Sequence, residues 1–360
     1  MHGFATILIV CLMGFVAEAH GANEVSYGPP PAWVKDEAAP NADGSMAEAP
    51  VKLLKRDYQL KFSPHHLEMY VESYFAVQTP QGLQALGNLA LPWKPDTDVL
   101  TVHKCRLLRA GQAIDLLTDG KKFEVLRREN NLEYAALDGM LTAVLQPAGM
   151  QVGDVLDLAF SIRRESSLIP APEMFLFNFA DVPASRVQLR ATWDKSTPLR
   201  WRASQDMKGI KDVLNGGEHE LRWVAEQVEP LKQPLNVPSR FLRIPMVEFT
   251  SYASWNDVSR TLAPLYAKAA GLRADSPVKL EARAIAQAQA DPVARLEAAL
   301  RLVQDRVRYV FLGMGDGNID PAGADLTWER RFGDCKGKTA LLVALLRELG
   351  IEAEPVLVAT

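Results

Sequence analysis

The chain has 360 residues, of which 48% are hydrophobic and 23% are charged. Single domains usually hold about 100 to 200 residues, so this length predicts at least two domains. The apolar share is that of a folded protein and excludes a chain that is disordered throughout. Forty basic and forty-four acidic residues give a formal charge of -4. Because the sequence has no basic block and no basic stripe interleaved with aromatic residues, nucleic acid is not an expected partner.

The first 50 residues divide into two segments. Residues 1–16 are an apolar run, and the small-residue sequence Ala-Glu-Ala follows at residues 17–19. A membrane-spanning helix needs roughly 20 apolar residues, so we predict a cleaved signal peptide over residues 1–19 rather than a retained membrane anchor. A periplasmic or secreted protein is therefore expected. Residues 20–50 are rich in Ala and Pro, which predicts a flexible leader, with a Pro-rich docking ligand as the alternative.

Residues 51–248 have hydrophobic side chains at every second position. Tyr58, Leu60 and Phe62 alternate with polar residues, and the segments 156–162 and 187–193 repeat this pattern. Such alternation is typical of strands with one buried face. Asp-Gly and Asn-Gly pairs separate several of these strands and favour tight hairpins. We predict an antiparallel β-sandwich with a binding or spacing function.

From residue 249 onward the hydrophobic period changes to that of helices. Ser254, Ser276 and Asp291 each stand where an N-cap is expected, and Pro277 and Pro292 follow at first helical positions. These residues start helices because their side chains accept hydrogen bonds from free backbone N–H groups, or because their φ is already helical. Three helices are therefore predicted between residue 254 and residue 307.

One further helix start lies at Cys335. Asp334 predicts an N-cap for a helix from Cys335 to Leu349, and the leucines between 341 and 349 predict its buried face. A cysteine in the first turn is close to unpaired N–H groups, which favour the reactive thiolate. The Asp334 charge opposes this effect, and Lys336 and Lys338 are able to offset it. Taken alone, a cysteine after Gly-Asp is more often a small residue at a helix start than a catalytic one.

The sequence Gly-Asp-Cys-Lys-Gly-Lys-Thr at residues 333–339, with the apolar helix and Gly-Ile turn after it, resembles the core motif of bacterial transglutaminase-like proteins. These belong to the papain-type cysteine superfamily. Residues 306–309 and the loop 313–323 resemble the same family upstream of its motif. Residues 51–248 resemble the domain of unknown function that commonly precedes such cores in exported bacterial proteins, with Val-Gly-Asp at 152–154 as one landmark.

The resemblance implies a Cys-His-Asp triad, in which a thiolate attacks an amide carbonyl, His moves the proton and Asp orients the His. Only Cys335 can be carried over, because all six His residues precede it, whereas the family has His and Asp on later strands. We expect a C-terminally truncated, inactive chain that stops as a strand over residues 355–358 begins. The expected fold class is α+β, with an incomplete papain-like core over residues 249–360.

Two residues near the motif are candidates for supporting the reaction. The backbone N–H of Cys335 is an expected oxyanion donor. Trp328 and Asp334 are candidates for lining the cleft or supporting the oxyanion, Trp328 through its indole N–H. Packing in the core is the other interpretation of Trp328, because a buried Trp usually serves there.

No cofactor is expected, because thiol chemistry needs none. Residues 316–320 match the first half of a calcium-binding loop, but Pro321 stands where Gly is needed and Thr327 replaces the bidentate Glu. No metal site is predicted. Cys105 is expected to pack as a small apolar residue in a strand over residues 100–108, and Cys11 is expected to be removed with the signal peptide.

These patterns predict an exported cysteine enzyme that acts on amide bonds through a thioester at Cys335. Transfer of the acyl group to an amine would make it a transglutaminase-like acyltransferase, and transfer to water a cysteine peptidase. The expected partners are a protein or peptide with a glutamine or other amide side chain, an amine in the first case, and the cell envelope. The alternative is a non-catalytic cell-envelope or protein-binding module on the same scaffold.

Overall fold

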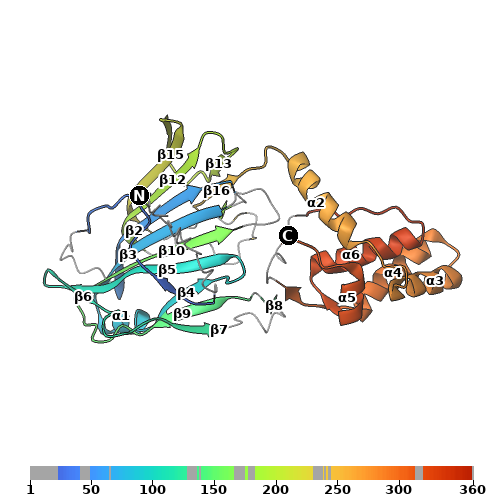
Figure 1. Cartoon of the computed structure of the whole chain (residues 1–360), viewed down its shortest axis with the longest axis horizontal. Coiled ribbons are helices and arrows are strands. Elements are labelled where there is room, and N and C mark those ends of the chain that lie inside the picture. The colour runs from blue at the N-terminus through green and yellow to red at the C-terminus, as the bar shows by residue number, and fades with distance from the viewer. Residues whose placement is uncertain are drawn as a thin grey trace, which may run out of the picture.

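A computed structural model gives the fold of the chain (Figure 1). It describes residues 23–40, 49–64, 66–127, 136–137, 139–165, 175–176, 183–229, 238, 241, 245–312 and 319–358. The predicted signal peptide lies outside these residues. Most strands lie at one end of the molecule, and the helices α2 to α6 lie at the other together with a few short strands (Figure 1). None of the helices in the described ranges is both long and apolar enough to cross a membrane.

A nine-stranded sheet dominates the first part of the chain. Its order is β1 (Ser26–Tyr27), β5 (Asp98–Arg109), β10 (Val155–Glu165), β3 (His66–Val77), β2 (Val51–Phe62), β12 (Ala184–Asp194), β15 (Glu218–Val228) and β14 (Lys211–Asn215), with β6 (Gln112–Asp115) also paired to β5. The pairs β1–β5 and β2–β12 are parallel and the others are antiparallel. The sheet is therefore mixed, whereas a purely antiparallel arrangement was predicted.

Four smaller sheets and one short helix complete the strand-rich part and its connection to the helices. The three-stranded sheets are β4 (Leu89–Trp93), β9 (Leu141–Leu145) and β7 (Glu124–Arg127), and β11 (Phe175–Leu176), β16 (Val247–Thr250) and β13 (Arg200–Ala203). The two-stranded sheets pair β17 (Arg308–Tyr309) with β19 (Phe332–Gly333), and β18 (Phe311–Leu312) with β8 (Ala136–Leu137); α1 spans Pro80–Ala85.

Both large hydrophobic clusters of this part lie on one face of the nine-stranded sheet. The register places Leu156 of β10 beside Phe75 of β3, and Phe75 beside Leu53 of β2. Leu156 belongs to the cluster under the β4–β9–β7 sheet, Leu53 to the cluster under the β11–β16–β13 sheet, and Phe75 packs against both. Side chains in register point to the same side of a sheet. The two three-stranded sheets thus cover the same face.

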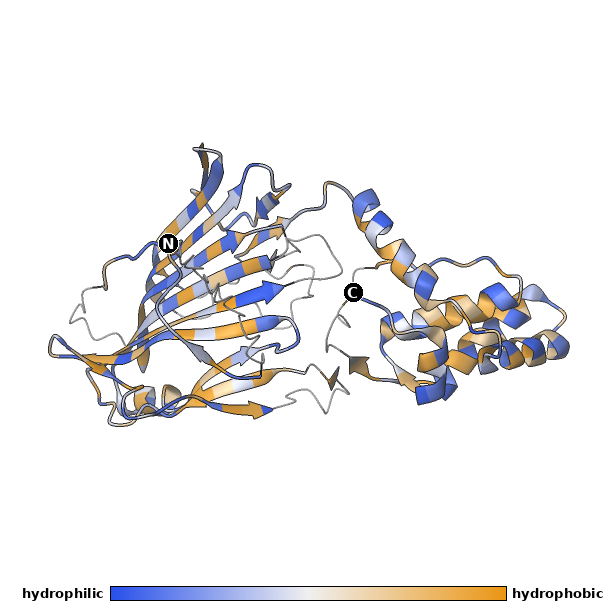
Figure 2. Cartoon of the chain, in the orientation of Figure 1, coloured by the Kyte–Doolittle hydropathy of each residue, from blue (hydrophilic) through white to orange (hydrophobic). Residues whose placement is uncertain are grey.

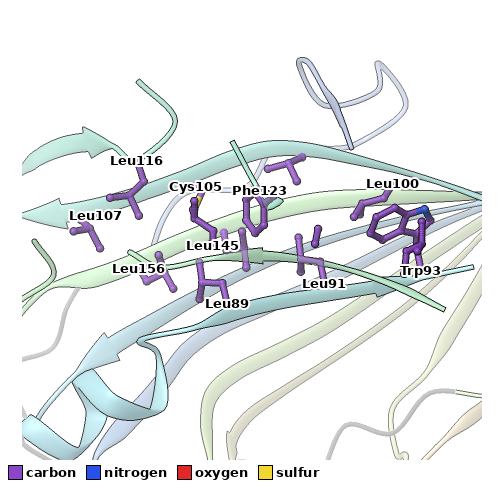
Figure 3. Close-up of a cluster of buried hydrophobic side chains, with 14 residues drawn as sticks. Leu89, Leu91, Trp93, Leu100, Cys105, Leu107, Leu116, Phe123, Leu145 and Leu156 are labelled. Carbon is purple, nitrogen blue, oxygen red and sulfur yellow. The ribbon is translucent and has the colours of Figure 1, made fainter. Parts of the chain in front are cut away.

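The cluster under β4–β9–β7 contains Cys105 (Figure 3). Its side chain is 1% exposed and lies among Leu107, Leu116, Phe123 and other apolar residues. Burial, together with the charges of nearby acidic groups, raises the pKa of Cys105 to about 12. The prediction that Cys105 packs as a small apolar residue is confirmed, and its thiol is chemically inert at neutral pH.

The opposite face of the nine-stranded sheet is mainly polar, apart from a small apolar cluster of Leu54, Tyr74 and Val155. Figure 2 shows that hydrophilic and hydrophobic residues alternate along the strands, as they do in a sheet with two unlike faces. We define this polar face by the buried side chains of Lys55, Asp57, Gln59, Tyr70, Glu72, Tyr74, Asp157, Ser161 and Gln188. Ion pairs of 2.6 Å and 2.7 Å join Glu72 to Lys104 and Asp157 to Arg106. Desolvation by burial raises the pKa of both Asp57 and Asp157.

Residues 28–38 of the N-terminal segment lie against this polar face, whereas β1 before them pairs with β5 at the sheet edge. The His103 ring bonds to the carbonyl of Gly28 at 2.9 Å, and the Gln59 side-chain amide both donates to and accepts from the backbone of Lys35. Trp33 donates its indole N–H to Glu68. The flexible leader predicted from composition is therefore wrong for these residues, because contacts with distant strands hold them and composition does not report such contacts.

Five helices occupy residues 255–348: α2 (Trp255–Ala269), α3 (Pro277–Ala288), α4 (Pro292–Arg306), α5 (Ala324–Arg330) and α6 (Cys335–Glu348). Ser254, Ser276 and Asp291 cap α2, α3 and α4 with their side chains, as predicted. The buried faces of α3 to α6 form one cluster that includes Val278, Val303, Leu341 and Leu345. This cluster holds the start of α6 in place.

The structure describes no strand at residues 355–358, where one was predicted. Val356, Leu357 and Val358 are 78%, 63% and 76% exposed, and their backbone pairs with no described strand. A strand exists only through hydrogen bonds to a neighbour, so an apolar run of this kind cannot form one by itself. The fold as described is a mixed α/β one with a large sheet content.

Candidate active site around Cys335

Cys335 is the first residue of α6. Asp334 precedes it in an extended conformation, and its Oδ1 accepts a hydrogen bond of 2.9 Å from the backbone N–H of Gly337. The predicted N-cap is confirmed. Asp334 is buried whereas Cys335 is exposed, so the cap is fixed and the thiol is open to solvent. A thiol in this position is close to the positive end of the helix.

The rest of α6 is anchored in the helical core. Leu341 and Leu345 are fully buried, and Leu346 and Val343 are nearly so. They pack with residues of α3, α4 and α5 in a single cluster. A helix fixed along its length keeps its first residue in one position, which suits a nucleophile.

Two glycines of the motif allow α5 to approach the start of α6 closely. A Cβ on Gly333 would lie 2.9 Å from the Cγ2 of Thr327, and a Cβ on Gly337 would lie 3.0 Å from the Oγ1 of Thr327. Real side chains do not approach to 2.9 Å, so Gly333 is required by this contact. Thr327 is 1% exposed and thus spaces α5 against the turn that carries Cys335.

The charges beside Cys335 are arranged around Asp334. Lys336 forms an ion pair with the Oδ2 of Asp334, and its ammonium lies 5.3 Å from the centre of the Phe311 ring. Lys338 points elsewhere and donates to the carbonyl of Val307 at 2.5 Å. Burial lowers the pKa of Lys338. Of the two lysines expected to offset the Asp334 charge, only Lys336 is paired with it.

Tyr309 is a site residue that the sequence analysis did not identify. The pairing of β17 with β19 places Tyr309 beside Gly333, two residues before Cys335. Its hydroxyl lies close enough to Cys335 for the Cys335 side chain to raise the pKa of Tyr309 and for the Cys335 backbone N–H to lower it. Burial raises the pKa of Tyr309, and the adjacent Cys335 and Asp334 charges raise it further. The sequence signal for Tyr309 was its place in residues 306–309. This segment resembles the transglutaminase-like family, but the resemblance assigned no function to Tyr309.

Tyr266 approaches the same site from α2. Burial raises the pKa of Tyr266, and the nearby Cys335 and Asp334 charges act in the same direction. Tyr266 also lines a cavity of about 590 Å³ between α2, α6 and the C-terminal segment. Its other lining residues are Trp255, Val258, Ser259, Leu262, Ala263, Ala267, Val343, Arg347, Glu354, Pro355, Val356 and Leu357.

Trp328 is not at the surface of a cleft. It is 4% exposed and belongs to the cluster of α3 to α6, with the Arg331 guanidinium 3.7 Å from its ring centre. The packing interpretation of Trp328 fits this position, and the suggested cleft-lining function does not. Arg331 takes a left-handed conformation with φ 60° at the end of α5, which turns the chain toward β19.

The histidines described in the structure are all in the strand-rich part. His66, His103 and His219 belong to β3, β5 and β15, so none of these three is in a helix near Cys335. Residues 316–318 of the calcium-like loop lie outside the described residues. Within the described ranges no group of three or more His, Cys, Asp or Glu side chains is arranged to hold a metal ion.

Residues 63–232 match a protein family described as a domain of unknown function with a solved structure, DUF3857. The match covers less than half of the chain and lies within residues 51–248, where resemblance to a domain of unknown function was expected. No curated protein matches the chain.

Among solved structures, the chain is similar to one from Parabacteroides distasonis ATCC 8503 described as a "putative protease". The TM-score is 0.66 at 14% identity, and the match covers 84% of this chain and 60% of that one. The chain therefore shares a fold with that protein and spans 60% of its length. An M1 zinc metallopeptidase from Deinococcus radiodurans also matches, at a TM-score of 0.30 and 12% identity over 57% of this chain and 43% of that one. A score of this size carries no argument.

Proposed function

We propose that this chain carries the nucleophile of an exported cysteine enzyme that forms a thioester with an amide substrate at Cys335. The observation that supports this most directly is the exposed Cys335 thiol at the capped start of α6, in contact with the Tyr309 hydroxyl. The fold shared with a protein described as a protease is consistent with chemistry on peptides or amides.

The proposed reaction has two steps. The Cys335 thiolate attacks the amide carbonyl carbon, a C–S bond forms, and the C–N bond breaks as the leaving nitrogen takes up a proton. An amine or water then attacks the thioester and releases the thiol. The histidine and aspartate that a complete triad requires are not assigned in this chain, and a protein or peptide with a glutamine or other amide side chain is the proposed substrate.

Tyr309 is placed to assist the first step. Its hydroxyl lies beside the Cys335 backbone N–H, which is the donor expected to stabilise the developing oxyanion. A substrate carbonyl oxygen bound between the two groups would accept one hydrogen bond from this N–H and a second from the Tyr309 O–H. In this proposal Tyr309 contributes to the oxyanion hole, and Asp334 contributes only by capping α6.

The test is acylation by an activated ester, because such a leaving group needs no proton from a histidine. The 360-residue chain is incubated with p-nitrophenyl acetate, and the modified residue is identified by mass spectrometry. We expect a hydroxylamine-sensitive acyl group on Cys335 that forms at least tenfold faster than on N-acetylcysteine methyl ester at the same pH. C335A should abolish it, Y309F should slow it about a hundredfold to a thousandfold, as loss of an oxyanion donor does, and C105A should leave it unchanged.

Acylation of Cys335 no faster than that of the free thiol compound would refute the nucleophile assignment and would favour the non-catalytic binding module. For turnover of a glutamine peptide with an amine we expect none from this chain. Product that depends on Cys335 would contradict that expectation while supporting the proposed nucleophile.

A further inference from the structure

Residues 28–38 of the chain itself cover the polar face of the nine-stranded sheet, and a surface covered in this way is usually apolar. The opposite face is apolar and carries both hydrophobic clusters, whereas this face buries Lys55, Asp57, Glu72 and Asp157. Burial of charged groups costs free energy unless they are paired, and permanent covers are therefore usually apolar. Polar contacts are typical of surfaces whose partners exchange.

The side chains of this face contact mainly the backbone of the N-terminal segment. His103 bonds to the carbonyl of Gly28, Arg190 donates to the carbonyl of Trp33 at 3.1 Å, and Lys55 donates to the carbonyls of Glu37 and Ala38 at 3.3 Å. These contacts come from β5, β12 and β2. A carbonyl is present in every residue, so such contacts do not require one particular sequence.

Gln59 makes the most specific of these contacts. Its Oε1 accepts from the Lys35 N–H at 2.9 Å and its Nε2 donates to the Lys35 carbonyl at 2.7 Å. Its Nε2 also donates to Asp57 at 2.8 Å, which fixes the orientation of the amide. A buried amide held in this way recognises the backbone N–H and C=O of one residue of a bound chain, whichever side chain that residue carries.

Within residues 28–38, the side chains of Trp33 and Lys35 contact the sheet. Trp33 donates to Glu68 at 2.5 Å, and the Lys35 ammonium lies 2.7 Å from Glu220. The segment begins with Gly28 followed by three prolines, whose restricted φ lowers the entropy lost on binding. Both properties are those of a bound peptide ligand.

We propose that the polar face is a binding surface for proline-containing polypeptide segments, and that residues 28–38 are its resident, exchangeable occupant. A second segment of the same backbone chemistry binds when residues 28–38 leave. This proposal concerns the sheet and does not depend on the chemistry of Cys335.

The test uses the 360-residue chain and a fluorescein-labelled synthetic peptide with the sequence of residues 24–38. In the wild type the resident segment competes at an effective concentration of roughly millimolar, so binding of the probe should be weak. The double variant W33A/K35A removes both side-chain contacts of the resident segment. We expect it to bind the probe at least tenfold more tightly than the wild type, measured by fluorescence anisotropy.

Two further substitutions in the W33A/K35A background locate the binding surface. R190M removes the donor to the Trp33 carbonyl and should weaken probe binding at least fivefold. R186M is the matched control, because Arg186 lies on the same face of β12 but pairs with Glu226 and Gln188. It should change binding less than twofold. A probe that is N-methylated at its Lys35 amide should bind at least fivefold more weakly, since it cannot donate to Gln59.

Hydrogen exchange of residues 28–38 in W33A/K35A makes the result decisive. If these amides lose protection and the probe still binds no better than to the wild type, the polar face does not accept a peptide from outside and the proposal is wrong. If the amides keep their protection, the segment is a fixed part of the fold, and the proposal is equally wrong.

Discussion

Gly333 and Thr327 touch where the chain turns from β19 into α6, and this contact sets the position of Cys335. In Gly333→Ala the new methyl group would lie 2.9 Å from the Cγ2 of Thr327, so α5 or α6 must shift. We expect a loss of about 1 to 3 kcal/mol in the free energy of unfolding, measured with urea, as overpacking usually costs. Adding Thr327→Ser removes that Cγ2 and should recover part of the loss. Gly323→Ala, which meets nothing within 4 Å, should change stability little; equal losses for G323A and G333A would contradict this explanation.

Asp334 and Cys335 could be placed from the sequence because helix capping depends on residues within one turn. Tyr309 and Thr327 could not be placed in this way. Tyr309 reaches Cys335 through a strand pair of two residues, which is too short to show a period, and Thr327 meets Gly333 only after α5 and α6 pack. Contacts of this kind depend on tertiary structure, which local patterns do not contain.

Asp57, in β2 beneath the N-terminal segment, should make stability depend on pH. Burial raises its pKa above 3.8, and the nearby Glu37 carboxylate acts in the same direction, against hydrogen bonds from Gln59 and Gln188. The folded state then holds this proton more tightly than the unfolded state does. Wild-type stability relative to D57N should therefore fall as pH rises from about 3.8 through the raised pKa.

The measurement is urea unfolding of wild type and D57N at several pH values between about 2 and 8, chosen to extend to both sides of the usual carboxyl pKa of roughly 4. D194N is the control, because the opposite dependence of stability on pH is expected for Asp194. Hydrogen bonds from Ser196 lower the pKa of Asp194, so the contribution of Asp194 should be present above about pH 3.8 and disappear at lower pH. A difference between wild type and D57N that does not vary with pH would rule out a raised pKa at Asp57.

At the scale of elements, local signals predicted the helices well and the N-terminal segment badly. α2, α3 and α4 begin at the capping residues read from the sequence, and the strands β2, β10 and β12 follow the alternation at residues 58–62, 156–162 and 187–193. The segment 23–40 has a composition typical of disorder, yet side chains of β2, β5 and β12 hold its backbone. Those partners are between 17 and 157 residues away in sequence.

The whole molecule contains separate cores in its strand-rich and helical parts. Among the described residues, the cluster of α3 to α6 draws only on residues 270–353, and the two large clusters of the sheets draw only on residues 25–249. A described link between the parts is the parallel pair of β8 and β18. We propose on this basis that two domains meet just after β16 ends at Thr250, close to the change of hydrophobic period at residue 249.

If the two cores are independent, a cavity in one should leave the other intact. Leu345 of α6 and Leu156 of β10 are both fully buried, and replacing either with Ala should cost about 2 to 5 kcal/mol. Native-state hydrogen exchange followed by mass spectrometry should show lower protection of α3 to α6 in L345A, and of β3, β5 and β10 in L156A.

Leu280, which is 61% exposed on α3, provides the control, because L280A creates no cavity. Equal loss of protection in both parts would mean that the sheets and helices unfold as one unit. Separate losses would mean that the helical part, and with it the position of Cys335, is maintained by its own core.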